Sequence, residues 1–267
     1  MKIVDFKEMK KKKEMITMLT AYDYFSGQIA QLCEIDIILV GDSLGMVIQG
    51  KKSTIEVSID DIVYHAKSVR NGAPDAFILA DMPYMSYHLD IFTTKVNAAR
   101  LMIEGKANAI KLEGGTDSRI DAIKALVDCE IPVCGHLGLT PQSINIFGDY
   151  KLQAKSKEEQ DRLLVQAKNI ESAGAFMLVL ECIPEELGMI VKDSLSIPVI
   201  GIGAGRYTDG QVLVWHDILG MSDLSPKFSK KYIDLKQLIK EMVLIYRKEV
   251  KDRDFPQKEN VFIPKEV

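Results

Sequence analysis

The chain has 267 residues, of which 47% are hydrophobic and 27% are charged, which is an ordinary globular composition with enough length for one large core. Its net charge of −4 at pH 7 argues against a nucleic-acid partner, since such proteins carry a basic excess. The sequence contains no run of about 18 apolar residues, so it predicts no membrane-spanning helix. The segment from Met1 to Met15 is too charged for a secretory signal and too acidic for a typical transit peptide.

The cysteines are predicted to be reduced. No two of them show C-x-x-C spacing, and their positions do not match zinc-ligand spacing. Most lie in or beside apolar patterns, where a free cysteine behaves as a small hydrophobic side chain. The pattern predicts a cytoplasmic protein. The cysteines are Cys33, Cys129, Cys134 and Cys182.

Near the N-terminus, the basic run from Lys10 to Lys13 is flanked by Glu8 and Glu14, which favours the solvated face of a short helical N-terminal extension. Apolar runs rich in β-branched residues then alternate with stretches of helical periodicity such as 95–102 and 158–172. This alternation predicts a parallel sheet covered by helices. The predicted strands are residues 15–19, 37–40, 77–80, 109–112, 132–134, 176–180, 198–202 and 212–215. Their number favours the α/β class and a single (β/α)8 TIM barrel domain over residues 1–267, rather than an open doubly wound sheet.

Two connections are longer than a minimal barrel needs. Residues 45–60 alternate apolar and polar side chains, which predicts a small β-hairpin flap after the second strand, and residues 137–157 are polar and rich in turn formers. Long strand-to-helix loops on a catalytic face commonly cover the substrate. Residues 232–250 have the period of an amphipathic helix, which either closes the barrel or forms a subunit contact.

Carboxylates stand at the ends of predicted strands. They are Asp42, Asp81, Glu113 and Glu181. A buried, unpaired carboxylate is costly, so a group of them indicates something positive among them, most simply a divalent ion and a cationic side chain. Asp42 and Asp81 have the alternative interpretation of helix N-caps. Together with Glu113 they match an oxygen-rich Mg²⁺ site at one mouth of the barrel.

Other candidate residues neighbour these carboxylates. Lys111 is two residues from Glu113, so both side chains leave the strand on one face; the lysine forms an ion pair at the rim, faces a substrate carboxylate, or does both. Ser43 could offer a hydroxyl or a backbone N–H to an anionic ligand. Glu181 is either a general base in a site of low dielectric or a solvated loop residue. His136, flanked by glycines at 135 and 138, is either a structural histidine or a pocket residue.

The residue sequences of several motifs resemble those of one known family, the ketopantoate hydroxymethyltransferases. The motifs occur in order from about residue 15 to residue 230, and the block at 135–143 is the most specific. They are residues 18–23, 39–46, 80–84, 111–115, 135–143, 180–184 and 198–205.

The resemblance implies a (β/α)8 barrel transferase that binds Mg²⁺, assembles as a homodecamer and acts in pantothenate biosynthesis. It also implies transfer of a hydroxymethyl unit from 5,10-methylenetetrahydrofolate to 3-methyl-2-oxobutanoate, through a Mg²⁺-stabilised enolate, giving 2-dehydropantoate. By resemblance, the metal set is Asp42, Asp81 and Glu113, and the substrate contacts are Asp42, Ser43, Asp81 and Lys111. Glu181 corresponds to the proton acceptor, and His136 to a residue of the pocket.

Two other functions compete with this one. Lyases and mutases of the isocitrate lyase and phosphoenolpyruvate mutase type also hold Mg²⁺ and an enolate at a barrel mouth, but they usually carry a catalytic cysteine in a lysine-rich loop, and the sequence has no such loop. A barrel used only for binding or as a scaffold would have lost the polar residues at its strand ends. The retained carboxylates, Lys111 and glycines argue against it.

Overall fold

The computed structural model of the chain describes residues 1–149, 151–223 and 226–263. The chain divides into two compact units, Met1–Trp215 and His216–Val267, which are described separately. The expectation that residues 1–267 form one domain stays a prediction. None of the helices in the described part of the chain is both long and apolar enough to span a membrane.

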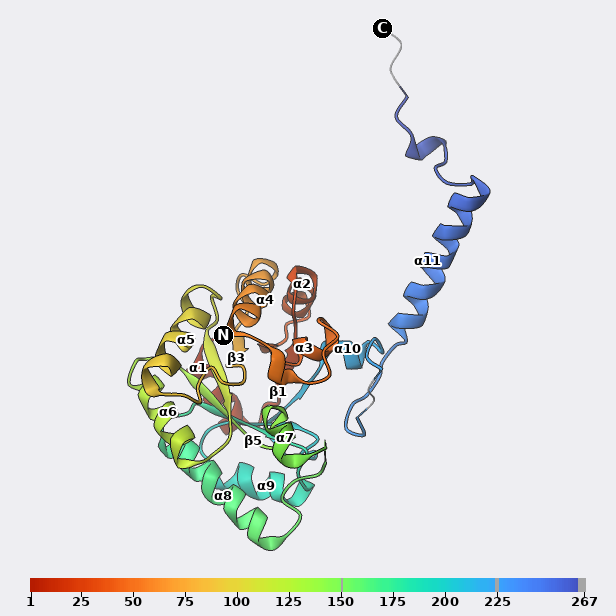
Figure 1. Cartoon of the computed structure of the whole chain (residues 1–267). Coiled ribbons are helices and arrows are strands. Elements are labelled where there is room, and N and C mark those ends of the chain that lie inside the picture. Colours follow the sequence, from red (N-terminus) through yellow and green to blue (C-terminus); the bar gives the residue numbers. More distant parts are fainter. Residues whose placement is uncertain (150, 224–225, 264–267) are drawn as a thin grey trace. The chain divides into compact units, whose positions relative to one another are not determined.

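The first unit is a closed barrel of parallel strands, in which every strand pairs with the next along the chain and β8 pairs with β1. Helices surround the strands on the outside (Figure 1). The strands are β1 (Ile16–Thr20), β2 (Ile37–Val40), β3 (Ile78–Asp81), β4 (Ala109–Glu113), β5 (Val133–Gly138), β6 (Met177–Glu181), β7 (Val199–Ile202) and β8 (Gly210–Leu213). The predicted α/β class and (β/α)8 barrel are confirmed. The largest boundary difference is in β5, which continues past residue 134 because residues up to Gly138 pair with β6.

The barrel helices begin at side-chain caps in several places. Asp23, Ser58, Asp90 and Ser156 each accept a hydrogen bond from the backbone N–H three residues on, which satisfies a donor that the first helical turn leaves unpaired. The α-helices of this unit are α1 (Ile3–Lys12), α2 (Tyr24–Leu32), α3 (Leu44–Val47), α4 (Ile59–Gly72), α5 (Ile91–Ile103), α6 (Asp117–Val127), α7 (Ile144–Phe147), α8 (Lys157–Ser172) and α9 (Glu185–Ser194). The helices expected over 95–102 and 158–172 are α5 and α8.

Alternate residues of each strand belong to two different hydrophobic clusters. Ile38, Val40 and their equivalents pack in the layer beneath the helices, whereas Ile37, Leu39 and their equivalents fill the barrel interior. Phe6 of α1 belongs to the interior cluster and is fully buried. Because interior positions alternate along a strand, the polar residues at the strand ends continue the interior rows.

The expected β-hairpin after the second strand is wrong. Residues 44–58, all of which the structure describes, contain α3 and a short 3₁₀ helix, η1 (Thr54–Glu56), and no strand. Gly45 lies in α3 against Val57, so closely that a Cβ on the glycine would come within 2.6 Å of Val57 Cγ2. The alternating apolar residues therefore come from a compact helical connection, and Ile59 already begins α4.

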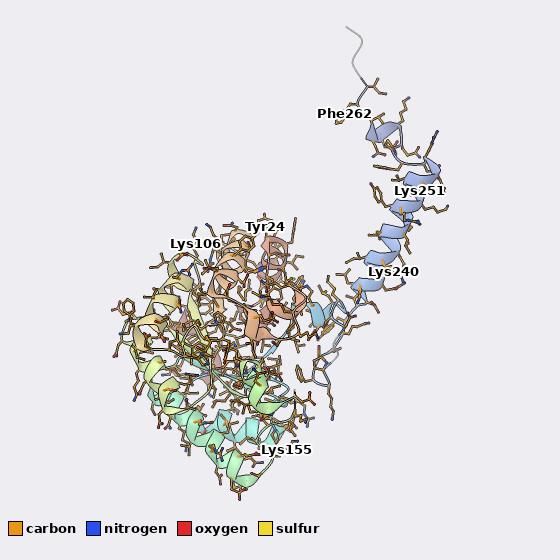
Figure 2. The ribbon with its side chains drawn as sticks, in the orientation of Figure 1. Tyr24, Lys106, Lys155, Lys240, Lys251 and Phe262 are labelled. Atoms are coloured by element: carbon orange, nitrogen blue, oxygen red, sulfur yellow. The ribbon has the colours of Figure 1, made fainter. Side chains whose placement is uncertain are left out.

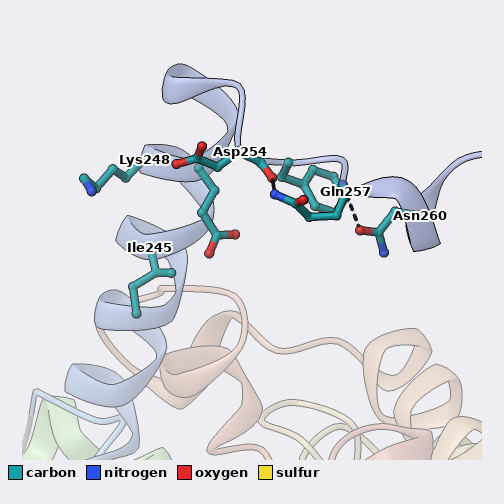
Figure 3. A pocket seen from close by; sticks show the side chains of 7 residues that line it. Ile245, Lys248, Asp254, Gln257 and Asn260 are labelled. Carbon is teal, nitrogen blue, oxygen red and sulfur yellow. Dashed lines mark hydrogen bonds between the residues drawn. The ribbon is translucent and has the colours of Figure 1, made fainter.

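The second unit contains α11 (Leu235–Asp252), which confirms the expected amphipathic helix, and a 3₁₀ helix, η3 (Lys258–Asn260). The short α10 (Trp215–Ile218) includes the boundary between the units. Lys240 and Lys251 project from α11 (Figure 2), and Leu238, Met242 and Ile245 of this helix are exposed. The segment after α11 turns back, and with the end of the helix it surrounds an open pocket (Figure 3). The pocket is lined by Ile245, Lys248, Glu249, Asp254, Phe255, Gln257 and Asn260.

Candidate active site

The predicted site residues lie at the carboxyl ends of consecutive strands. Strand register explains their proximity, since Asp81 is aligned with Lys111, and Glu113 with His136. Asp42 and Ser43 follow β2 directly, and Glu181 is the last residue of β6. Apart from the partly exposed Ser43 and Glu181, these side chains are buried, with 2% to 4% of their surface exposed. The structure thus brings all seven to one mouth of the barrel.

Lys111 is paired with carboxylates inside the barrel. Its Nζ lies 2.8 Å from Oδ1 of Asp81, and Oδ2 of Asp81 accepts a hydrogen bond from the backbone N–H of Asp42 at 3.1 Å. Burial alone would lower the pKa of Lys111, but the charges of Asp81, Glu113 and Asp42 outweigh burial and raise this pKa. Lys111 is therefore a permanent cation among the carboxylates.

His136 lies between two glutamates. Its Nδ1 is 3.3 Å from Oε1 of Glu113, and its Nε2 is 3.3 Å from Oε2 of Glu181. Burial and the charge of Lys111 oppose protonation, but the two glutamates outweigh them and raise the pKa of His136 to about 9. For Glu113, burial raises the pKa, while His136 and Lys111 act more strongly in the other direction and leave this pKa below its ordinary value. The arrangement favours an imidazolium held by two carboxylates.

The surroundings of Asp42 disfavour the ionised form of its carboxyl group. Burial, followed by the charges of Asp81 and Glu113, raises its pKa well above the ordinary range. Gln142 offsets part of this by donating a hydrogen bond from Nε2 to Oδ2 of Asp42 at 2.8 Å. A cation beside Asp42 would relieve the remaining repulsion.

Gly138 sets the approach of β5 to β6 at the site. It has a φ of +94°, and a Cβ at this position would lie 2.2 Å from the carbonyl oxygen of Glu181. The same carbonyl accepts a hydrogen bond from the N–H of Leu139 at 2.8 Å. Only glycine combines this conformation with so close a contact, so Gly138 fixes the backbone that carries Glu181.

Three neighbours of the site had no role in the sequence interpretation. Oη of Tyr22 lies 2.8 Å from Oγ of Ser43. Tyr87 and Gln142 are buried and are hydrogen-bonded to each other beside Glu113. Gln142 lies within the motif at 135–143, and its position directly after the fixed-φ residue Pro141 is the one local signal that it is held in place.

The residues present fit a hydrated Mg²⁺ ion better than a fully enclosed metal. Among the described residues, no three His, Cys, Asp or Glu side chains converge tightly enough to bind an ion on their own. Mg²⁺ commonly keeps several waters and takes one or two carboxylates from the protein. Asp42 and Asp81, buried and linked through the Asp42 N–H, supply such a pair, and Glu113 is engaged with His136.

Comparison with known proteins identifies a family. A family described as ketopantoate hydroxymethyltransferase matches residues 1–258. A 3-methyl-2-oxobutanoate hydroxymethyltransferase of Clostridium botulinum (strain Alaska E43 / Type E3) is 51% identical over 97% of this chain and 94% of its own length. A 3-methyl-2-oxobutanoate hydroxymethyltransferase of Bacillus pumilus (strain SAFR-032) is 51% identical over 98% of this chain and 94% of its own length. A solved 2,3-dimethylmalate lyase of the PEP mutase/isocitrate lyase superfamily aligns over 97% of this chain and 91% of its own, with a TM-score of 0.60 and 13% identity, a likeness in fold alone.

Proposed function

The chain belongs to the ketopantoate hydroxymethyltransferase family and is a hydroxymethyltransferase of pantothenate biosynthesis, and on this basis we propose its donor, its metal and its catalytic residues. The one-carbon donor is 5,10-methylenetetrahydrofolate, the acceptor is 3-methyl-2-oxobutanoate and the product is 2-dehydropantoate. A water molecule supplies the hydroxyl oxygen, because the donor carries its one-carbon unit between two nitrogens.

The observation that supports this proposal is the placement of Glu181 relative to Asp42 and Asp81. Asp42 follows β2 and Glu181 ends β6, and these strands are four steps apart in a closed barrel of eight. A proton acceptor thus stands across the mouth from the carboxylates that would hold a cation. A 2-oxo acid bound between them would present its carbonyl and carboxylate to one side and its C3 proton to the other.

In this proposal Asp42 and Asp81 hold Mg²⁺, with Glu113 beside them. The ion would supply Lewis-acid stabilisation of the enolate oxygen. Ser43, at the start of α3, offers a hydroxyl to the substrate carboxylate. Lys111, a cation fixed by Asp81 at 2.8 Å, adds positive charge on the side where negative charge develops.

Glu181 takes the proton from C3 of the acceptor in this mechanism. Its carboxylate is partly exposed and reaches His136 at 3.3 Å, so it faces both the mouth and a cation that orients it. Loss of the proton leaves an electron pair on C3, which forms the new carbon–carbon bond to the methylene carbon as one of its two carbon–nitrogen bonds breaks. Water then forms the carbon–oxygen bond as the second carbon–nitrogen bond breaks, and the two released nitrogens take up the C3 proton and one proton of the water. General-base catalysis of this kind contributes about 10² to 10⁴ in rate.

A proton NMR time course with 3-methyl-2-oxobutanoate, 5,10-methylenetetrahydrofolate and Mg²⁺ tests the function directly. The isopropyl doublet of the acceptor should collapse to a methyl singlet while a hydroxymethyl signal grows. An unchanged spectrum with folded, metal-loaded protein would overturn the proposed substrates. The cytoplasmic location and the homodecamer stay predictions; light scattering of the purified chain measures the assembly.

A further inference from the structure

Gln142 joins groups from three neighbouring strand ends in one hydrogen-bond network. It is the middle residue of the 3₁₀ helix η2 (Pro141–Ser143), in the long connection after β5, and it is 4% exposed. The connection continues to α8 and includes Tyr150, which lies outside the described residues. Gln142 therefore reaches the barrel mouth from the long, polar connection that is expected to cover the substrate.

The side chain of Gln142 uses all of its polar groups. Nε2 donates to Oδ2 of Asp42 at 2.8 Å and to the carbonyl oxygen of Met82 at 3.0 Å. Oε1 accepts a hydrogen bond from the Tyr87 hydroxyl at 2.7 Å. An amide with both donors and its acceptor engaged has one orientation, because flipping it would place an oxygen against the Asp42 carboxylate.

A second arm of the network reaches Glu113. The backbone N–H of Gln142 donates to Oε2 of Glu113 at 3.1 Å. The Tyr87 hydroxyl, which donates to Gln142, also accepts the backbone N–H of Glu113 at 3.1 Å. The guanidinium of Arg119 lies over the Tyr87 ring, with its Cζ 4.9 Å from the ring centroid, and so packs against the tyrosine. One residue of the connection after β5 thereby fixes a carboxylate at β2 and a carboxylate on β4.

We propose that Gln142 is a positioning residue that orients Asp42 for divalent-cation binding and holds Glu113 beside the cation site, an inference that rests on the proposed function. Residues that are hydrogen-bonded to metal ligands, without binding the metal themselves, commonly contribute about 10- to 100-fold to metal affinity. The chemistry here is the same, since a carboxylate with one oxygen held by an amide presents its other oxygen in a fixed direction. Gln142 touches the carboxylates, and Tyr87 acts through Gln142.

Gln142→Met is the most informative variant. Methionine nearly matches glutamine in volume and keeps the backbone N–H to Glu113, but it cannot donate to Asp42. Gln153→Ala is the matched control, because Gln153 lies in the same connection and its Nε2 donates to the carbonyl of Lys151 instead. Tyr87→Phe removes only the hydroxyl and tests the second arm.

Calorimetric titration of the full-length proteins with Mg²⁺ is the experiment, with thermal unfolding to show that each variant is folded. We expect Gln142→Met to weaken Mg²⁺ binding about 10- to 100-fold, Tyr87→Phe to weaken it less, and the double variant to fall short of the product of the two, because the residues share one network. Gln153→Ala should bind like the wild type. Raised Mg²⁺ should restore most of the turnover of Gln142→Met, which a general structural defect would not allow.

The outcomes separate this inference from the proposed function. If the wild type binds Mg²⁺ and turns over the 2-oxo acid, and folded Gln142→Met binds Mg²⁺ equally well, the positioning role is overturned alone. If the wild type binds Mg²⁺ but does not turn over the acid, the proposed function fails while the affinity series still decides the role of Gln142. A wild type without Mg²⁺ affinity overturns both.

Discussion

Nε2 of His136 lies 3.3 Å from Oε2 of Glu181, and the opposite ring nitrogen lies 3.3 Å from Glu113. The imidazole therefore connects the proposed base to a carboxylate beside the proposed metal. A cation in this position holds the Glu181 carboxylate in one orientation.

Glu181→Gln should keep binding of 3-methyl-2-oxobutanoate and lose about 10² to 10⁴ in turnover, because glutamine has nearly the same shape but cannot accept the C3 proton. Exchange of that proton with deuterated water, followed by NMR without the folate, measures proton removal alone. Glu186→Gln is the control, since Glu186 is an exposed glutamate in the next helix. Turnover and exchange near the wild-type rates in Glu181→Gln would refute the assignment of the base.

Removal of divalent ions with EDTA should lower turnover by at least about 100-fold, because Lewis-acid stabilisation of an enolate is worth several kcal/mol. Mg²⁺ added in excess of the chelator should restore it. The measurement is the initial rate before chelation, after chelation and after Mg²⁺ is added back. Activity that is indifferent to chelation would exclude Asp42 and Asp81 as metal-holding residues.

The barrel and the gathering of the candidate residues at one of its mouths could be predicted from the sequence, because both depend on local patterns. A buried strand is an apolar run, and its last polar residue lies at the carboxyl face whatever the rest of the chain does. The contacts of Gln142 depend instead on tertiary structure. Its partners Asp42 and Tyr87 lie 100 and 55 residues away in the sequence, so no local sequence pattern predicts these contacts.

The prediction of a β-hairpin after β2 was wrong for a related reason. Apolar residues at every second position are typical of a strand with one buried face, but the same residues can also line a short helix and a turn. In the folded connection Gly45 packs closely against Val57. That contact involves no periodicity and is visible only once the connection is folded.

Lys111→Met should destabilise the metal-free protein strongly, by about 3–5 kcal/mol, because it leaves the buried carboxylate of Asp81 without its cation. Mg²⁺ should restore part of the loss, since the ion would supply positive charge to the same carboxylates. Thermal unfolding with and without Mg²⁺ measures both effects. Lys157→Met is the control, because Lys157 pairs with Asp161 on the surface of α8, where such a pair contributes about 0.5 kcal/mol or less. Equal melting temperatures for Lys111→Met and the wild type without metal would contradict the pairing.

The thiol of Cys134 should resist alkylation in the folded protein even at pH 10. It is fully buried in the barrel interior, and burial raises its pKa to about 12, whereas only the thiolate reacts. Cys33 and Cys129 are exposed and should react under the same conditions, which peptide mass spectrometry after iodoacetamide treatment will show.

The raised pKa of Cys134 also fixes the sign of a pH effect on stability. As the pH rises above the ordinary cysteine value of 9.0, the unfolded chain loses this thiol proton before the folded chain does. The neutral thiol therefore contributes stability that is fully present below about pH 9 and is lost between there and pH 12, at up to about 1.4 kcal/mol per pH unit. Unfolding of the wild type and of Cys134→Ala at pH 8 and pH 10 measures it, because other titrating groups cancel in the difference. The wild type should lose more stability than the variant over this range, and parallel losses would show that Cys134 titrates normally and that the barrel interior admits water.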